Sequence, residues 1–202
     1  MLNLSINKLK VSGLAIVLMA FSAIGYADDI TDSISEALQY YKNGEYTDAL
    51  ESLDYASQLI KQKKGKGLES FLPEPLSGWT AKEANSQTVG TAMFSGGVTA
   101  ERKYNKGSSS VTVQIITDSP FMQGVMMMFS NYPMFAESDG GELEKIEHQK
   151  AIVKFDATNK RGEIKIVVAN RFLVLIEGNG ITKGDLKGYA KAIDYKKLAS
   201  LP

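Results

Sequence analysis

The spacing of apolar residues changes once along this chain, and the change divides it into two parts. From residue 30 to residue 64 apolar residues recur every three or four positions, which predicts amphipathic helices. From Trp79 onward apolar and polar residues alternate, which predicts strands with one buried face. Pro73 and Pro75 separate the two patterns, because proline is excluded from a helix interior. We therefore expect a helical hairpin over residues 28–67 and a sheet domain over residues 68–202.

The first part predicts two helices joined by a short turn. Their apolar faces should consist of Ile30, Ile34, Ala37, Leu38 and Tyr41, and of Ala49, Leu50, Leu53, Ala56 and Ile60. Asn43 and Gly44 favour a helix end, since both tolerate a left-handed backbone. The second helix should begin near Thr47 and end at Gly65 and Gly67. Such a pair must bury its apolar stripe, either on the neighbouring domain or on another copy of the chain.

The second part predicts an α+β domain with a mostly antiparallel sheet and two helices. Strands are expected over residues 99–104, 109–117, 143–148, 151–156, 163–169 and 172–177. The run from Phe172 to Ile176 is apolar on both faces, so its strand should be central and covered twice. Helices should begin at Ser119-Pro120 and at Thr182, with Asp185 completing a capping box. The order of strands, helix, strands and helix is typical of an α+β fold.

The first 27 residues have the layout of a cleaved secretory signal. Lys8 and Lys10 begin it, the apolar run 11–24 follows, and Gly25-Tyr26-Ala27 supplies the small residues of a cleavage site. We expect cleavage after Ala27, with an uncleaved anchor as the alternative, and no later segment of membrane-spanning length. The chain contains no cysteine, so the exported domain must be held by its core without disulfides. Together these features predict a periplasmic protein.

Three resemblances add expectations about the fold. The segment ALQYYKNGEYTDALESLDYA resembles one tetratricopeptide repeat, on Ala37, Tyr40, Tyr41, Gly44, Tyr46, Ala49, Leu50 and Ala56. That family binds peptides or partner proteins in a groove of stacked repeats, and a single repeat implies the hairpin shape without the groove. The segment FLPEPLSGW, residues 71–79, is similar to a group of uncharacterised proteobacterial exported proteins. Pro75, Gly78, Trp79 and the element order resemble the α/β/α sandwich of photosystem II extrinsic proteins and Mog1-like proteins.

Patterns for catalysis and metal binding are sparse. His148 is the one histidine, and no G-x-S-x-G turn accompanies it, so a hydrolase that uses it is a lesser alternative. Met122, Met126 and Met134 offer thioethers that suit Cu(I), which makes a Cu(I)-handling protein another alternative. The same spacing serves a core helix, because methionine packs adaptably against aromatic side chains.

The remaining signals favour binding over chemistry. The balance of 23 basic and 23 acidic residues gives no electrostatic footprint for nucleic acid. A local basic cluster, Lys61, Lys63, Lys64 and Lys66, is expected to be the solvated end of a helix. The sequence thus predicts a non-catalytic, cofactor-free binding or protein-interaction module whose partner is an envelope protein or an apolar ligand. Its candidate contact residues are Tyr41, Tyr46, Met127 and Phe129.

Overall fold

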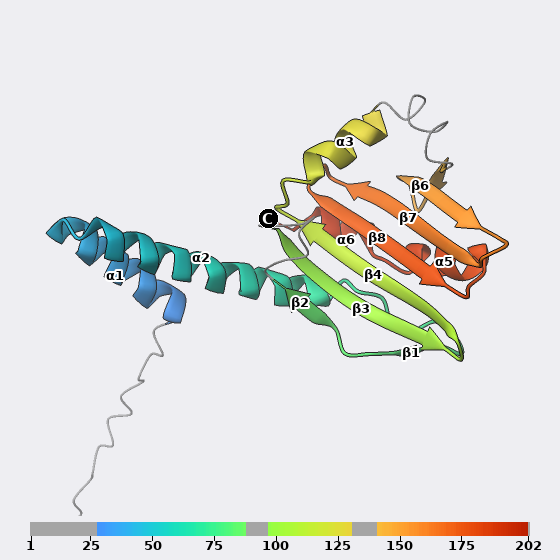
Figure 1. Ribbon diagram of the computed structural model, residues 1–202, viewed down its shortest axis with the longest axis horizontal. Coiled ribbons are helices and arrows are strands. Elements are labelled where there is room, and N and C mark those ends of the chain that lie inside the picture. The colour runs from blue at the N-terminus through green and yellow to red at the C-terminus, as the bar shows by residue number, and fades with distance from the viewer. Residues whose placement is uncertain (1–27, 88–96, 131–140, 202) are drawn as a thin grey trace, which may run out of the picture.

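The computed structural model describes residues 28–87, 97–130 and 141–201. Two paired helices, α1 (Asp29–Asn43) and α2 (Tyr46–Glu69), project from one end of a β-sheet (Figure 1). The predicted helical hairpin is therefore present, and Gly44 ends α1 with a φ of 83°. The expected signal segment, residues 1–27, lies outside the described residues.

The second part of the chain forms one sheet in which every pair of neighbouring strands is antiparallel. Its strands are β1 (Thr80–Ala81), β2 (Asn85–Gln87), β3 (Val98–Lys106), β4 (Ser109–Thr117), β5 (Glu142–Ile146), β6 (Gln149–Asp156), β7 (Arg161–Val168) and β8 (Phe172–Asn179). They lie in the order β1-β3-β4-β8-β7-β6-β5, and β2 also pairs with β3. This arrangement confirms the predicted α+β class with a mostly antiparallel sheet.

The main core lies on one face of the sheet. Side chains of β3, β4, β8, β7 and β6 point into it and meet α5 (Lys183–Lys191) and the short α6 (Tyr195–Ala199). A second, smaller cluster on the opposite face lies under α3 (Met122–Ser130), where Met122 and Val125 contact Ile116 and Leu173. The run 172–176 belongs to β8, between β4 and β7, and all its residues are buried. The prediction of a central strand buried on both faces is confirmed.

The segment 71–79 connects the hairpin to the sheet and is anchored at several points. Phe71, Leu72 and Trp79 are buried. The hydroxyl of Tyr104 on β3 donates a hydrogen bond of 2.6 Å to the carbonyl oxygen of Pro73. The ring of Trp79 meets that of Tyr189 on α5 edge-on, with 5.5 Å between the ring centroids. The segment therefore packs against the main core through Phe71, Leu72 and Trp79.

The prediction that α2 ends at Gly65 and Gly67 is wrong, because the helix continues to Glu69. A Cβ atom at Gly65 would lie 2.9 Å from the Cβ of Ser86 on β2. Glycine at this position therefore allows the helix to approach the sheet closely. Leu68, one turn later, is 1% exposed and anchors the inner end of α2 in the main core. Tertiary packing thus stabilises the last turn of the helix, although the two glycines would destabilise it in isolation.

Two other boundaries differ from the sequence-based expectation by a few residues. The strand expected over 143–148 ends at Ile146, because Glu147 and His148 form a turn with φ values of 43° and 65°. The helix expected from Ser119-Pro120 begins at Met122, after a turn in which the Ser119 hydroxyl accepts a bond from the Phe121 N–H. The predicted capping box at Thr182 and Asp185 is confirmed.

Candidate functional site

The interface between α1 and α2 is built from small residues. Ala37, Ala49 and Ala56 are 3%, 5% and 2% exposed, and they let the two helices lie close together. The larger apolar residues of the same two stripes are not enclosed by this contact. Tyr41, Tyr46, Leu50 and Leu53 are all at least half exposed, and Ile34, Leu38 and Ile60 are exposed to a similar extent. Within the described chain, the apolar stripe is not covered by the sheet domain.

These exposed side chains line a shallow groove along one side of the hairpin, which we call the hairpin groove. It has a volume of about 500 Å³ and is lined by Ile34, Ala37, Leu38, Tyr41, Tyr46, Ala49, Leu50 and Leu53. The rings of Tyr41 and Tyr46 flank the turn between the helices, with their centroids 5.9 Å apart. Every lining side chain is apolar or aromatic, which is typical of a surface that meets another apolar surface.

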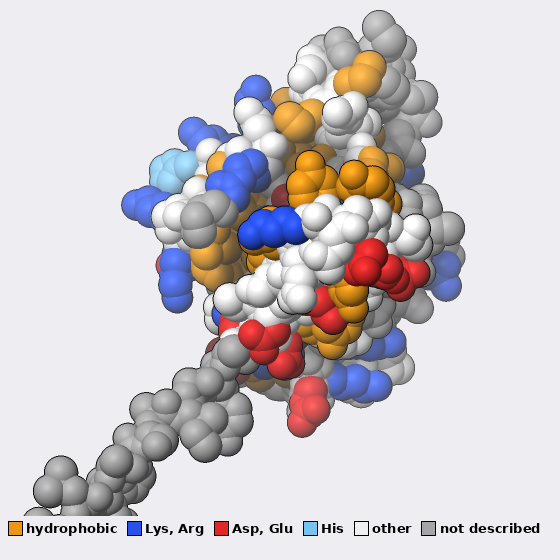
Figure 2. All heavy atoms as spheres, turned by 90° about the vertical axis from the view of Figure 1, so that its left-hand side faces the viewer, with side chains coloured by type: hydrophobic (Ala, Val, Ile, Leu, Met, Phe, Trp, Pro, Cys, Tyr) orange, Lys and Arg blue, Asp and Glu red, His pale blue; other side chains and the backbone are white. Residues whose placement is uncertain are grey.

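The opposite side of the hairpin is polar and acidic. A hollow there is lined by Asp29, Asp32, Ser33, Ser35, Glu36, Gln39 and Tyr55. The Tyr40 hydroxyl donates to the Glu36 carboxylate over 3.4 Å, and the negative charge of Glu36 raises the pKa of that tyrosine. Figure 2, which faces the outer end of the hairpin, shows hydrophobic side chains beside acidic ones on this part of the surface. The hairpin therefore has two chemically distinct sides.

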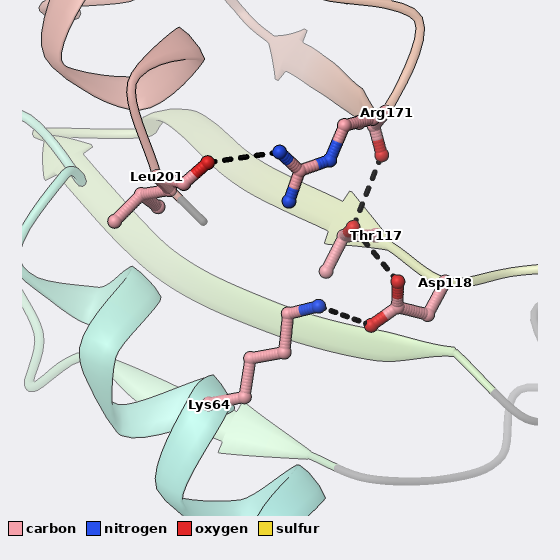
Figure 3. A network of polar contacts seen from close by, with 5 residues as sticks. All are labelled: Lys64, Thr117, Asp118, Arg171 and Leu201. Carbon is pink, nitrogen blue, oxygen red and sulfur yellow. Dashed lines mark hydrogen bonds and ion pairs between the residues drawn. The ribbon is translucent and has the colours of Figure 1, made fainter.

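An ion pair joins the base of the hairpin to a group of polar contacts at one end of the sheet (Figure 3). Lys64 Nζ on α2 lies 2.5 Å from Asp118 Oδ2, just after β4. The Thr117 hydroxyl donates to the Arg171 carbonyl oxygen at 3.1 Å, and the Arg171 guanidinium donates to the Leu201 carbonyl oxygen at 2.8 Å. Four separate parts of the chain thus meet here, and the Lys64–Asp118 ion pair joins the hairpin to them, beside the burial of Leu68 in the main core.

The four predicted contact residues fall into two places. Tyr41 and Tyr46 lie together in the hairpin groove, whereas Met127 and Phe129 lie on α3, over the opposite face of the sheet from α5. Met127 is 62% exposed, while Phe129 is half-buried against the small core cluster. The four residues therefore do not form one continuous surface. Ile34, Leu38, Leu50 and Leu53, predicted only as packing residues, contribute most of the groove wall, and their helical spacing was the signal for it.

The thioethers of the Cu(I) alternative are in different settings. Met122 is buried in the apolar cluster beneath α3, together with Ile116 and Leu173, and Met126 is half-buried. Met134 lies outside the described residues. Packing explains Met122 without a metal ion, because its neighbours in this cluster are apolar.

The one histidine of the chain, His148, lies in the turn of a β-hairpin. His148 is exposed in the turn between β5 and β6, where it adopts a left-handed backbone conformation. General acid–base catalysis requires a substrate site within hydrogen-bonding reach of the side chain. His148 lines neither the hairpin groove nor the acidic hollow of the hairpin. The hydrolase alternative therefore gains no support from these hollows.

A third hollow lies on the charged surface of β6, β7 and β8. It is lined by Lys154, Asp156, Arg161, Gly162, Glu163, Lys165, Glu177 and Gly178. Lys165 forms an ion pair with Glu163. Desolvation and the nearby charge of Glu163 raise the pKa of Glu177. The ion pair lies along β7, and Glu163 faces Glu177 of β8 directly, so this hollow holds the charged side chains of a solvated sheet face.

Comparison with known proteins leaves the geometry as the main guide to function. No protein-family model, no curated protein and no solved structure matches this chain. Among the described residues, no helix has both the length and the apolar character needed to cross a membrane. The hairpin groove is the largest gathering of exposed apolar side chains on the described surface, so it is the candidate functional site.

Proposed function

We propose that this protein is an exported, non-catalytic interaction module that binds another polypeptide through the hairpin groove. The observation that carries the proposal is the contrast between the two parts of the chain. Among the described residues, the sheet domain leaves only Phe121, Met127 and Leu143 exposed among its large apolar residues, whereas the hairpin exposes seven along one side. A soluble surface rarely keeps a contiguous apolar patch of this kind unless something binds there. We expect the protein to act in the periplasm, after cleavage of its signal segment at Ala27.

The form of the groove favours a helical partner segment. At about 1.5 Å per residue, the exposed face of α2 from Tyr46 to Ile60 is about 20 Å long, which matches about four turns of a helix. A groove between two helices accepts a third helix by packing its apolar side chains between the ridges. The two tyrosines at its outer end add aromatic surface with polar tips, a common feature of contact sites. The expected ligand is therefore an amphipathic helix.

Site-specific photo-crosslinking in intact cells tests this function. A photo-reactive amino acid placed at Leu50, in the groove, is expected to give covalent adducts with a polypeptide after illumination. The matched control places the same group at Tyr55, which is also exposed but lies on the acidic side of the hairpin. Adducts from position 50 that are absent from position 55 would support the proposal. An absence of polypeptide adducts at Leu50 and at a second groove position, Leu38, would contradict it.

A further inference from the structure

The hairpin carries a large local excess of negative charge. Residues 28–60 include eight acidic residues and one basic residue, Lys42, whereas residues 61–202 include twenty basic and fifteen acidic residues. In the part of the chain that the structure describes, one of the eight forms an ion pair, Asp28 with Lys63 at 3.2 Å. The other seven are exposed acidic side chains whose charge no basic residue neutralises there: Asp29, Asp32, Glu36, Glu45, Asp48, Glu51 and Asp54.

Two of these carboxylates lie along the edge of the hairpin groove. Glu51 and Asp54 directly follow the groove residues Leu50 and Leu53, and their spacing of three residues puts them on one flank of α2. The buried Ala49 faces α1 on the other flank, so the two carboxylates border the groove on the side away from α1. Asp54 accepts a hydrogen bond of 2.7 Å from the side-chain amide of Gln58, which is uncharged and leaves the negative charge in place. The α2 edge of the groove is therefore acidic.

This combination of apolar groove and acidic edge restricts what can bind there. Among the described residues, no group of three or more metal-binding side chains is placed to hold a metal ion. Anionic lipid headgroups attract basic segments, so a membrane surface would repel this edge. A polypeptide helix with an apolar face bordered by lysine or arginine is complementary both to the groove and to its edge.

We propose that the groove's partner is a basic amphipathic helix, which packs its apolar side chains against Leu50 and Leu53 and places its basic side chains beside Glu51 and Asp54. This inference rests on the proposed function and adds the charge of the ligand to it. Complementary charges at the edge of an interface select between partners and are screened by salt. The preference for a basic over an acidic helix should therefore weaken as the ionic strength rises.

Two synthetic peptides of equal length test the inference, with their affinity for the exported protein measured by fluorescence anisotropy. Both are model helices of about 18 residues with one leucine face, and the positions that border this face are all lysine in one peptide and all glutamate in the other. We expect the lysine peptide to bind at least about ten-fold more tightly at low salt, and this ratio to fall as sodium chloride is added.

Charge reversal locates the preference at the groove edge. Glu51→Lys combined with Asp54→Lys should weaken binding of the lysine peptide about ten-fold and strengthen binding of the glutamate peptide. The matched control, Asp32→Lys combined with Glu36→Lys, changes the net charge equally on the acidic side of the hairpin. At physiological salt, where charges more than about 8 Å apart are largely screened, it should change either dissociation constant less than about three-fold. All four side chains are exposed, so both double variants should keep the wild-type circular dichroism spectrum and melting temperature.

The outcomes separate this inference from the proposed function. Equal affinities for the two peptides, tighter binding of the glutamate peptide, or equal effects of the two double variants would overturn the basic helix as partner and leave an amphipathic helix as the ligand. Binding of neither peptide would contradict the helical ligand of the proposed function itself. Photo-crosslinks from Leu50 that join two hairpins of this chain would also overturn the inference, because each hairpin is acidic.

Discussion

At the scale of single residues, the start of α5 shows how a short polar contact sets local stability. The Thr182 hydroxyl accepts a hydrogen bond from the Asp185 N–H at 3.1 Å and donates to the Asp185 carboxylate at 2.6 Å. This hydrogen bond from Thr182 is the main cause that holds the pKa of Asp185 below its ordinary value. A carboxylate with a lowered pKa in the folded state stabilises the fold above its ordinary pKa, and the effect is lost as the pH falls through the lowered value.

Thr182→Ala should therefore reduce the free energy of unfolding by about 1 kcal/mol at pH 7. The difference from the wild type in the free energy of unfolding should narrow as the pH falls below about 4, where Asp185 takes up a proton in the unfolded chain, and should continue to narrow as the pH falls through the lowered pKa of the folded wild type. Urea unfolding at pH 7 and pH 3 measures both effects. Thr182→Ser keeps the hydroxyl and should behave as the wild type, so an equal loss in both variants would show that the cap is not the cause.

At the scale of elements, two glycines in the last turns of α2 have opposite roles. A Cβ atom at Gly67 would have no heavy atom within 4 Å, whereas one at Gly65 would overlap with Ser86. Alanine is a better helix former than glycine by up to about 1 kcal/mol, which applies to both positions. At Gly65 the overlap opposes this gain, and overpacking in a well-packed contact costs about 1–3 kcal/mol.

We accordingly expect Gly67→Ala to stabilise the protein by about 0.5 kcal/mol and Gly65→Ala to destabilise it by about 1 kcal/mol. Chemical unfolding of the two variants beside the wild type provides the measurement. The pair is its own control, since the same substitution is made two residues apart in one helix. A stabilising effect at both positions would mean that the contact between α2 and β2 can relax at little cost.

At the scale of the whole molecule, α2 contributes both to the hairpin groove and to the main core. Its outer half forms one wall of the hairpin groove, while its inner end carries Leu68 into the main core. Leu68→Ala should therefore lower the free energy of unfolding by about 3 kcal/mol, because it leaves a cavity in that core. The same substitution at Leu143, which is 46% exposed on β5, should cost less than about 1 kcal/mol. Similar losses at the two positions would show that the inner end of α2 is not part of the cooperative core.

The sequence alone was sufficient for the main elements and the class of the fold. The change from helical to alternating spacing predicts the hairpin and the antiparallel sheet, since each backbone form repeats its side-chain direction with its own period. It also places Tyr41 on the apolar face of the first helix, whereas Tyr46, expected just before the second helix, is the first residue of α2. The exact end of α2 was not predictable from Gly65 and Gly67, because local propensity is outweighed by the burial of Leu68.

Only the tertiary structure decided which apolar faces are enclosed and which remain open. Spacing identifies the residues that share a face, but it carries no information on what covers that face, because the covering elements come from distant parts of the chain. The stripe of α5 and the stripe of the hairpin follow the same helical pattern in the sequence. The sheet buries Leu186 and Tyr189 of α5. The helical hairpin instead projects from one end of the sheet, so Leu50 and Leu53 remain exposed to solvent (Figure 1). The difference arises from the direction in which the inner end of α2, fixed by Leu68 and Lys64, carries the hairpin away from the core.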